Sequence, residues 1–93
     1  VYEDDKMIVI RDVAPAAPLH VLMIPKAHTE NIITAEPELL LYMFGKVKEL
    51  AEKLGVNEKG FRIVANTGDD GGQTVKHLHI HLLGGKALGW PPC

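Results

Sequence analysis

The sequence has 93 residues, a net charge of −2 with histidine neutral, and one cysteine. This length supports one hydrophobic core, so we predict a single domain over residues 1–93. Without a basic run the sequence argues against nucleic-acid binding, and no apolar run is long enough to span a membrane. A single cysteine excludes an internal disulfide, which fits a reducing compartment, so we predict a cytoplasmic protein. Because the chain does not begin with Met, we expect a further N-terminal segment in the native protein.

The first part of the sequence predicts three strands separated by turns. Residues 1–3 and 7–10 are expected to pair as a hairpin. Prolines interrupt the following stretch, so residues 11–19 are expected to form a loop. Residues 20–24 are the third predicted strand, which Pro25 ends.

A long apolar stripe in the middle of the sequence predicts the main helix. Thr34 is the candidate N-cap, and Pro37 suits the first helical turn. Apolar side chains then recur at three- and four-residue steps as far as Leu54, and Gly55 is the expected C-cap. We expect the stripe to pack on a sheet, with a helix–helix contact between subunits as the alternative. Gly45 is expected to mark a close approach of two backbones.

A fourth strand and a glycine-rich loop follow the helix. Residues 61–65 alternate as a strand, and residues 66–75 include three glycines. Glycines allow backbone N–H groups to converge on an anion, and the side chains of Gln73 and Thr74 add hydrogen-bond donors. Such a loop is more often a simple turn. Beside a histidine-rich strand, however, it predicts half of a phosphate site.

Histidines alternate with large aliphatic residues in residues 77–83. Strict alternation predicts a half-buried strand, whose aliphatic residues face the core: Leu78, Ile80 and Leu82. The other face then carries three of the five histidines of the chain: His77, His79 and His81. Neighbouring imidazoles on that face start about 6.6 Å apart, so one phosphate group can contact all three.

These three histidines suggest either phosphoryl chemistry or a metal site. Imidazole can attack phosphorus and leave again, while flanking imidazoles neutralise charge or move a proton. His79 is the natural nucleophile because it has a histidine on both sides. Histidines at positions i and i+2 can also chelate a metal, although the only cysteine is the terminal Cys93. The metal site therefore stays as an alternative.

Two other polar residues admit a structural interpretation. Asp12 follows the second predicted strand, where a carboxylate usually belongs to a turn. Its two oxygens also suit the adjacent hydroxyls of a sugar. His28 stands alone in a predicted connection, and a lone histidine is most often a structural residue.

The strands, central helix and further strands predict an α+β fold on an antiparallel sheet. The histidine pattern, together with its flanks, closely resembles the histidine triad (HIT) family: Gly71-Gly72-Gln73-Thr74-Val75, His77-x-His79-x-His81, Gly84-Gly85 and Trp90-Pro91-Pro92. The similarity extends to earlier segments: Asp12-Val13-Ala14-Pro15-x-Ala17-Pro18-x-His20 and Ile24-Pro25-Lys26. The double glycine and the Trp-Pro-Pro tail are similar to the Hint branch. The resemblance implies a HIT-like antiparallel sheet of about five strands with one main helix.

The resemblance also implies an activity. The implied activity is that of a purine nucleoside phosphoramidate hydrolase of the adenosine 5′-monophosphoramidase type. The enzyme would act as a homodimer, without metal or cofactor, and its ligands would be AMP, GMP or phosphoramidate conjugates. His79 would attack the α-phosphorus to form a nucleotidyl-histidine intermediate, which water then hydrolyses. His77 would orient that imidazole, and His81 and His20 would contact the phosphate region and assist proton movement.

Further residues are implied to bind the substrate. Asn66, Gln73 and Thr74 would hold the phosphate, and Asp12 would bind the ribose hydroxyls. The base pocket would be lined by Val13 and Leu22. Trp90 lies in a tail that in relatives reaches toward the partner subunit and influences leaving-group preference. A nucleotide-binding regulatory or interaction module is the alternative function.

Overall fold

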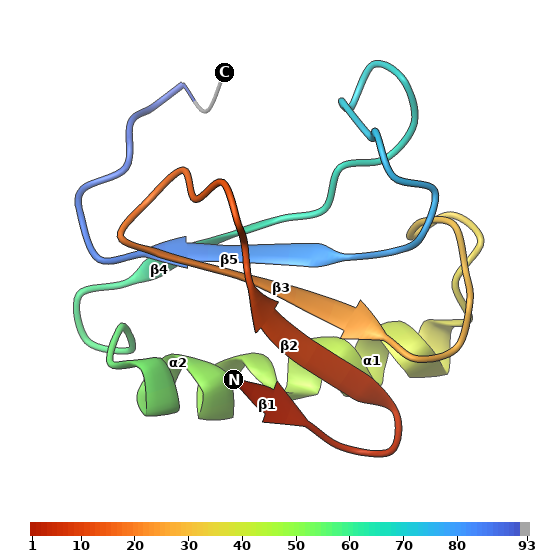
Figure 1. Cartoon of the computed structure of the whole chain (residues 1–93), viewed down its shortest axis with the longest axis horizontal. Coiled ribbons are helices and arrows are strands. Elements are labelled where there is room, and N and C mark those ends of the chain that lie inside the picture. Colours follow the sequence, from red (N-terminus) through yellow and green to blue (C-terminus); the bar gives the residue numbers. More distant parts are fainter. Residues whose placement is uncertain (92–93) are drawn as a thin grey trace.

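Five antiparallel strands form one open sheet in the computed structural model, which describes residues 1–91 (Figure 1). The strand order is β1-β2-β3-β5-β4, so the two central strands come from opposite ends of the chain. The strand bounds are β1 Tyr2–Glu3, β2 Met7–Arg11, β3 Leu19–Pro25, β4 Phe61–Val64 and β5 Ile80–Gly84. The predicted α+β fold on a five-stranded antiparallel sheet is therefore confirmed. Pro92 and Cys93, which the sequence analysis also considered, lie outside the described residues.

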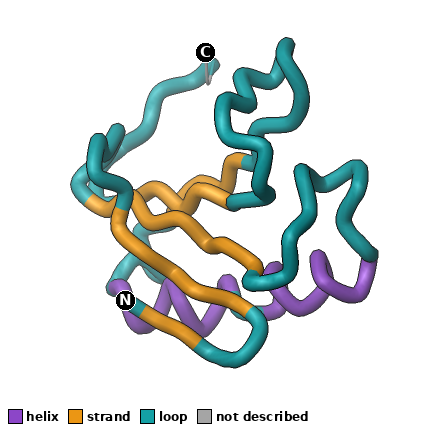
Figure 2. The backbone as a smooth tube through the Cα atoms, turned by 45° about the vertical axis from the view of Figure 1, so that its right-hand side comes forward, coloured by secondary structure: helices purple, strands orange, loops and turns teal. Residues whose placement is uncertain are grey.

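The predicted main helix lies along one face of the sheet, while long loops rise on the other (Figures 1 and 2). It is interrupted at Lys46, which divides it into α1 (Pro37–Gly45) and α2 (Val47–Leu54). The backbone N–H of Lys46 donates to the carbonyls of Met43 and Phe44 and so closes α1 with a tight turn. Gly55 ends α2 with a φ of 78°, as expected of a glycine C-cap. No helix within residues 1–91 combines the length and apolar character needed to cross a membrane.

The hydrophobic core lies between the sheet and the helices. Successive residues of a strand point to opposite faces, so every second side chain of β2, β3 and β5 enters this core. Its largest fully buried side chains are Met7, Val9, Val21, Met23, Met43, Leu50, Leu78, Ile80 and Leu82. Burial of each large aliphatic side chain stabilises the fold by about 1.5–3 kcal/mol, which fixes the pleat of β3 and β5. The alternate residues must therefore face the loops.

The histidine-rich strand is shorter than predicted, since β5 begins at Ile80 rather than at His77. Its pairing with β3 starts at the Met23–Ile80 pair, and β3 ends two residues later at Pro25. The preceding segment is held instead by the N–H of Leu78, which donates to the carbonyl of Thr29 at 2.7 Å. The predicted faces are nevertheless correct, because Leu78 is only 2% exposed.

Two details of the predicted helix were wrong. The N-cap residue is Glu36, whereas the hydroxyl of Thr34 accepts hydrogen bonds from the N–H groups of Glu30 and Asn31 in the preceding turn. A Cβ built on Gly45 meets no atom within 4 Å, so this glycine does not mark a close approach of backbones.

Candidate functional site

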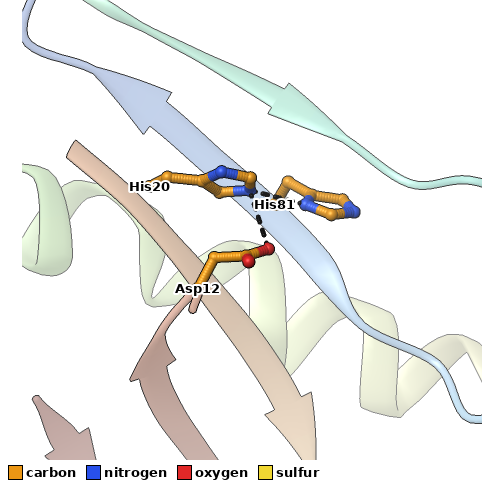
Figure 3. A group of neighbouring side chains, drawn as sticks. All are labelled: Asp12, His20 and His81. Atoms are coloured by element: carbon orange, nitrogen blue, oxygen red, sulfur yellow. Dashed lines mark hydrogen bonds and ion pairs between the residues drawn. The ribbon is translucent and has the colours of Figure 1, made fainter. Parts of the chain in front are cut away.

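His20 and His81 meet on the face of the sheet that carries the loops, beside Asp12 (Figure 3). His20 comes from β3 and His81 from β5, while Asp12 follows β2 directly. The His20 Nε2 atom lies 2.8 Å from His81 Nδ1 and 3.4 Å from Asp12 Oδ2. Neighbouring strands thus place an imidazole pair and a carboxylate within hydrogen-bonding range.

A backbone contact fixes which nitrogen of His20 carries the proton. The N–H of Ala16 donates to His20 Nδ1 at 3.0 Å, so Nδ1 must present a lone pair. The proton of neutral His20 then sits on Nε2 and is donated to His81 Nδ1. It follows that neutral His81 carries its own proton on Nε2, at the far side of its ring from His20 (Figure 3).

The surroundings of His81 favour its neutral form. Burial lowers the pKa of His81 below its ordinary value, and the imidazoles of His79 and His20 lower it further, while Asp12 opposes the shift. A neutral imidazole at neutral pH can donate a hydrogen bond from Nε2 without giving up the proton.

The same three groups are the ones that could hold a metal ion. Within residues 1–91, the ligand atoms of Asp12, His20 and His81 lie within 4.8 Å of one another, whereas the trio considered from the sequence does not form such a group. A metal would need a lone pair on His20 Nε2. That tautomer would turn Nδ1–H toward the N–H of Ala16, so two donors would face each other. The hydrogen bonds therefore fit a proton-ordered imidazole pair better than a metal site.

His79 is oriented by the backbone of its own segment. Its Nδ1 lies 2.8 Å from the carbonyl oxygen of His77. A carbonyl oxygen only accepts hydrogen bonds, so Nδ1 carries the proton and Nε2 keeps a free lone pair. The rings of His79 and His81 lie edge to face with centroids 5.1 Å apart. The middle histidine therefore has the tautomer that a nucleophile requires.

His77 is anchored on both sides of its ring. Its Nε2 donates to the carbonyl of Pro25 at 2.9 Å, and its Nδ1 lies 3.1 Å from Nδ1 of His28. Since His77 Nδ1 must then accept, His28 is the donor. Sequence reasoning treated His28 as a structural residue, because an isolated histidine 49 positions before His77 gives no pattern that would indicate the contact.

Gln73 joins two loops through all of its amide atoms. The side chain is 6% exposed, and its oxygen accepts from Asn31 and from the N–H of Gly68. Its amide nitrogen donates to the carbonyls of Glu30 and Val75. Both amide protons of Gln73 are therefore engaged within the protein. The predicted contact of Gln73 with phosphate stays a prediction.

The glycine-rich loop depends on two of its glycines. A Cβ on Gly71 would collide with the backbone carbonyl of Thr67, and Gly72 has a φ of 75°, which favours glycine. Inside this loop the amide of Asn66 donates to the carbonyl of Gly71 at 2.7 Å. The loop is thus a compact unit with Asn66 at its base.

The remaining predicted residues divide into two groups. Leu22 helps to line an apolar cavity of about 260 Å³, and two histidines of the triad lie in its wall. The lining residues are Leu22, Ile24, Val75, His77 and His79. The other three are exposed and do not line it: Val13, Thr74 and Trp90. The sheet therefore assembles the imidazoles and one apolar wall.

An α+β fold whose antiparallel sheet carries alternating histidines on its loop-bearing face is typical of a nucleotide-binding or hydrolase domain of the histidine triad class. The family model described as HIT domain matches residues 1–88. The chain is 55% identical over 95 residues to a HIT-like protein of Synechococcus elongatus, covering 99% of this chain and 82% of that protein. It is 49% identical over 87 residues to the protein HitA of Neisseria gonorrhoeae, covering 90% and 80% respectively. The chain therefore belongs to the HIT domain family.

Solved structures agree with this assignment. A HIT family hydrolase from Legionella pneumophila superposes with a TM-score of 0.95 at 43% identity, covering 100% of this chain and 86% of that one. A histidine triad nucleotide-binding protein from Candida albicans gives a TM-score of 0.82 at 30% identity, covering 98% and 72%. The HIT fold predicted from the sequence is confirmed.

Proposed function

We propose that this protein is a metal-independent purine nucleoside phosphoramidate hydrolase of the Hint branch. The observation that carries the proposal is the hydrogen bond from His79 Nδ1 to the carbonyl of His77, which leaves Nε2 free for attack. The likeness to a HIT family hydrolase and to a histidine triad nucleotide-binding protein supports the reaction class and the kind of ligand.

In the first step, the lone pair of His79 Nε2 forms a bond to the α-phosphorus. The P–N bond breaks, its electron pair goes to the leaving nitrogen, and that nitrogen takes a proton from solvent. Neutral His81 donates a hydrogen bond from Nε2 to a phosphoryl oxygen, where negative charge accumulates. His20 acts through His81 by holding its tautomer.

In the second step, water attacks the phosphorus of the nucleotidyl-histidine. The bond to Nε2 breaks, its electron pair returns to His79, and the proton of the water is lost to solvent. The products are the nucleoside monophosphate and the enzyme in its starting state. Splitting one displacement into two in this way needs only a nucleophile that is also a good leaving group, as imidazole is.

Substrate binding follows from the residues around the imidazoles. Asp12 accepts hydrogen bonds from the ribose hydroxyls, since its carboxylate has further lone pairs beyond those used by Ala14 and His20. Leu22, from the apolar cavity, and the exposed Val13 contact the base of AMP, GMP or their phosphoramidate conjugates. The phosphate is held by Asn66 and Thr74, with Gln73 fixing the loop that carries them.

The active form is a homodimer in the cytoplasm. β4 is an edge strand, so one of its sides lacks a strand partner among the described residues. Phe61 on β4 and Phe44 on α1 are 37% and 47% exposed and border the same hollow. A second copy pairing edge to edge would satisfy the strand and bury both rings. Sedimentation of the parent and of Phe61→Glu tests this, with a monomeric parent as the contrary result.

The central experiment measures AMP release from an adenosine phosphoramidate in the presence of EDTA. The parent and the surface control Lys59→Ala should turn over equally, whereas His79→Ala should lose activity but still bind AMP. Turnover of His79→Ala at the parent rate would contradict the nucleophile assignment. A parent that binds AMP without turnover would indicate the nucleotide-binding module, and loss of activity with EDTA would indicate a metal site.

A further inference from the structure

Two adjoining hollows lie at the end of the sheet to which the β5 arrow points (Figure 1). The larger has a volume of about 420 Å³ and the smaller about 280 Å³. Four residues line both hollows, from the segments just before β4 and just after β5: Lys59, Gly60, Lys86 and Ala87. Because the hollows share these walls, we name them together the basic hollow.

The basic hollow is separate from the imidazole group. Gly84, the last residue of β5, lies three positions beyond His81, which is about 10 Å along the strand. A Cβ on Gly84 would come within 3.0 Å of Val56, which lines the larger hollow, so this wall belongs to the helix side of the sheet. His81 points to the opposite face, with the loops. A ligand of the basic hollow therefore does not contact the imidazole pair.

The charge of the basic hollow is positive and uncompensated. Its walls carry the cationic side chains of Lys59, Arg62 and Lys86, and no acidic residue lines either hollow. None of these three cations forms an ion pair within residues 1–91. The guanidinium of Arg62 donates to the carbonyl of Gly89 at 2.8 Å, which leaves further N–H donors of its fork. Cations gathered without a counter-charge repel one another, and a bound anion relieves that repulsion.

The backbone around the basic hollow also favours an anion. The C-terminus of a helix normally repels negative charge, and α2 ends at this place. Here, however, the carbonyls of Ala51, Glu52 and Val56 accept hydrogen bonds from the N–H groups of the turn that follows the helix. On the other wall, the N–H groups of Lys86 and Ala87 donate to no backbone carbonyl within residues 1–91. The walls thus keep donors free while these acceptors are engaged.

We propose that the basic hollow binds a chain of two phosphates. Phosphate oxygens accept charge-assisted hydrogen bonds from lysine and arginine, and they also bind free backbone N–H groups. A single phosphate occupies one hollow, whereas a diphosphate extends along Lys59 and Lys86 and reaches Arg62 in the smaller hollow. Inorganic pyrophosphate and a nucleoside diphosphate both carry this group. The site is additional to the proposed phosphoramidase activity and does not depend on it.

Equilibrium dialysis with labelled inorganic pyrophosphate tests the proposal directly. The parent should bind one pyrophosphate per chain, and orthophosphate should bind more weakly because it reaches fewer cations. In Lys59→Gln/Lys86→Gln the Kd for pyrophosphate should rise about tenfold, since charge-assisted hydrogen bonds are lost. Lys48→Gln/Lys53→Gln is the matched control, because it removes two charges from exposed positions on α2 that do not line the basic hollow. Its Kd should equal that of the parent.

Two further measurements locate the bound pyrophosphate. His79→Ala should bind it as the parent does, because the triad lies outside the basic hollow. Trp90, the only tryptophan in the sequence, has its ring centroid 5.9 Å from the central carbon of Arg62. Its fluorescence should therefore change on titration with pyrophosphate and saturate with the Kd found by dialysis. Without pyrophosphate, Lys59→Gln/Lys86→Gln should release AMP from adenosine phosphoramidate at the parent rate.

A parallel titration with ADP distinguishes the two sources of diphosphate. If the affinity for ADP also falls in Lys59→Gln/Lys86→Gln, the basic hollow takes nucleoside diphosphates. If only the affinity for pyrophosphate falls, the free anion is the ligand.

Several results would overturn the proposal. They are no binding of pyrophosphate at millimolar concentration, orthophosphate binding as tightly as pyrophosphate, or an equal loss of affinity in Lys48→Gln/Lys53→Gln. Lost binding in His79→Ala would move the anion to the triad, and unchanged Trp90 fluorescence would move it away from Arg62. A parent that binds pyrophosphate but does not turn over phosphoramidate would overturn the proposed function and leave this site standing.

Discussion

His28 and His77 lie ring to ring, with their Nδ1 atoms 3.1 Å apart and their centroids 5.0 Å apart. Only one proton can lie between these two nitrogens, and the bond from His77 Nε2 to Pro25 assigns it to His28. An exposed histidine from the β3–α1 connection thus adds a second hydrogen bond that supports the tautomer set by the Pro25 carbonyl. Because His77 also supplies the carbonyl that orients His79, the contact reaches the proposed nucleophile through one residue.

Removal of the His28 side chain should therefore slow catalysis without preventing binding. We expect His28→Ala to lower kcat about tenfold with KM within about twofold, because His77 loses a hydrogen-bond donor and the segment that carries His79 loosens. His28→Asn keeps an N–H donor and should stay near the parent. Lys76→Ala, which removes an exposed neighbour of His77, is the control. Parent-like kcat in His28→Ala would show that Pro25 alone holds His77.

His20 should matter through the tautomer of His81 rather than through contact with the leaving group. In His20→Ala, neutral His81 is free to place its proton on either nitrogen, and we expect kcat/KM to fall about 10- to 100-fold. Long-range proton–nitrogen NMR should show the proton of His81 on Nε2 in the parent and a mixture in the variant. An unmixed Nε2–H form in the variant would contradict this account.

Asp4 should make folding stability depend on pH in the acid range. The hydroxyl of Tyr42, assisted by backbone N–H groups and Tyr2, holds the pKa of the Asp4 carboxyl far below its usual range. The resulting stabilisation is present above the unfolded pKa of about 3.9 and is lost as pH falls toward the lower folded value.

Thermal melts of the parent and of Asp4→Asn test this dependence. The variant should melt at a lower temperature at pH 7, and the difference should shrink between about pH 4 and pH 2. Asp5→Asn, which changes the neighbouring carboxylate, should follow the parent. A difference in melting temperature that is constant with pH would exclude the linkage.

Gln73→Glu should uncouple the two loops that Gln73 joins. The substitution keeps the shape of the side chain but places a carboxylate oxygen against the carbonyls of Glu30 and Val75. We expect a loss of about 1–3 kcal/mol of folding stability from the unsatisfied buried groups, and a higher KM because the phosphate loop is less ordered. Urea unfolding and steady-state kinetics measure the two effects. If KM changed with stability intact, direct phosphate contact would be the better interpretation.

Alternation was a reliable guide to the faces of the sheet but a poor one to the ends of its strands. Leu78, Ile80 and Leu82 are buried as predicted, because burial depends only on which way each side chain points. The start of β5 depends instead on contacts outside the sheet, since the N–H of Leu78 donates to the carbonyl of Thr29 while β3 continues to Pro25. Pro25 ends β3 and gives its carbonyl to the ring of His77, a contact that no local pattern encodes.

In the candidate site, too, the sequence predicted the residues but not all of the contacts between them. The resemblance predicted four histidines as catalytic, and of these His20 and His81 meet across neighbouring strands. The contacts that order their protons involve the N–H of Ala16 and the ring of His28. These partners come together only through loop conformation, so they carry no periodic signal.

Because side chains alternate between the two faces of β3, inserting or deleting a residue in this strand should be more harmful than substituting one. Val21 and Met23 are buried in the core between the sheet and the helices, while His20 and Leu22 occupy the opposite face. One inserted residue would exchange the two sets and drive an imidazole into the core. Conservative changes of side-chain size at these positions should thus be tolerated, whereas single-residue insertions and deletions should abolish folding and chemistry together.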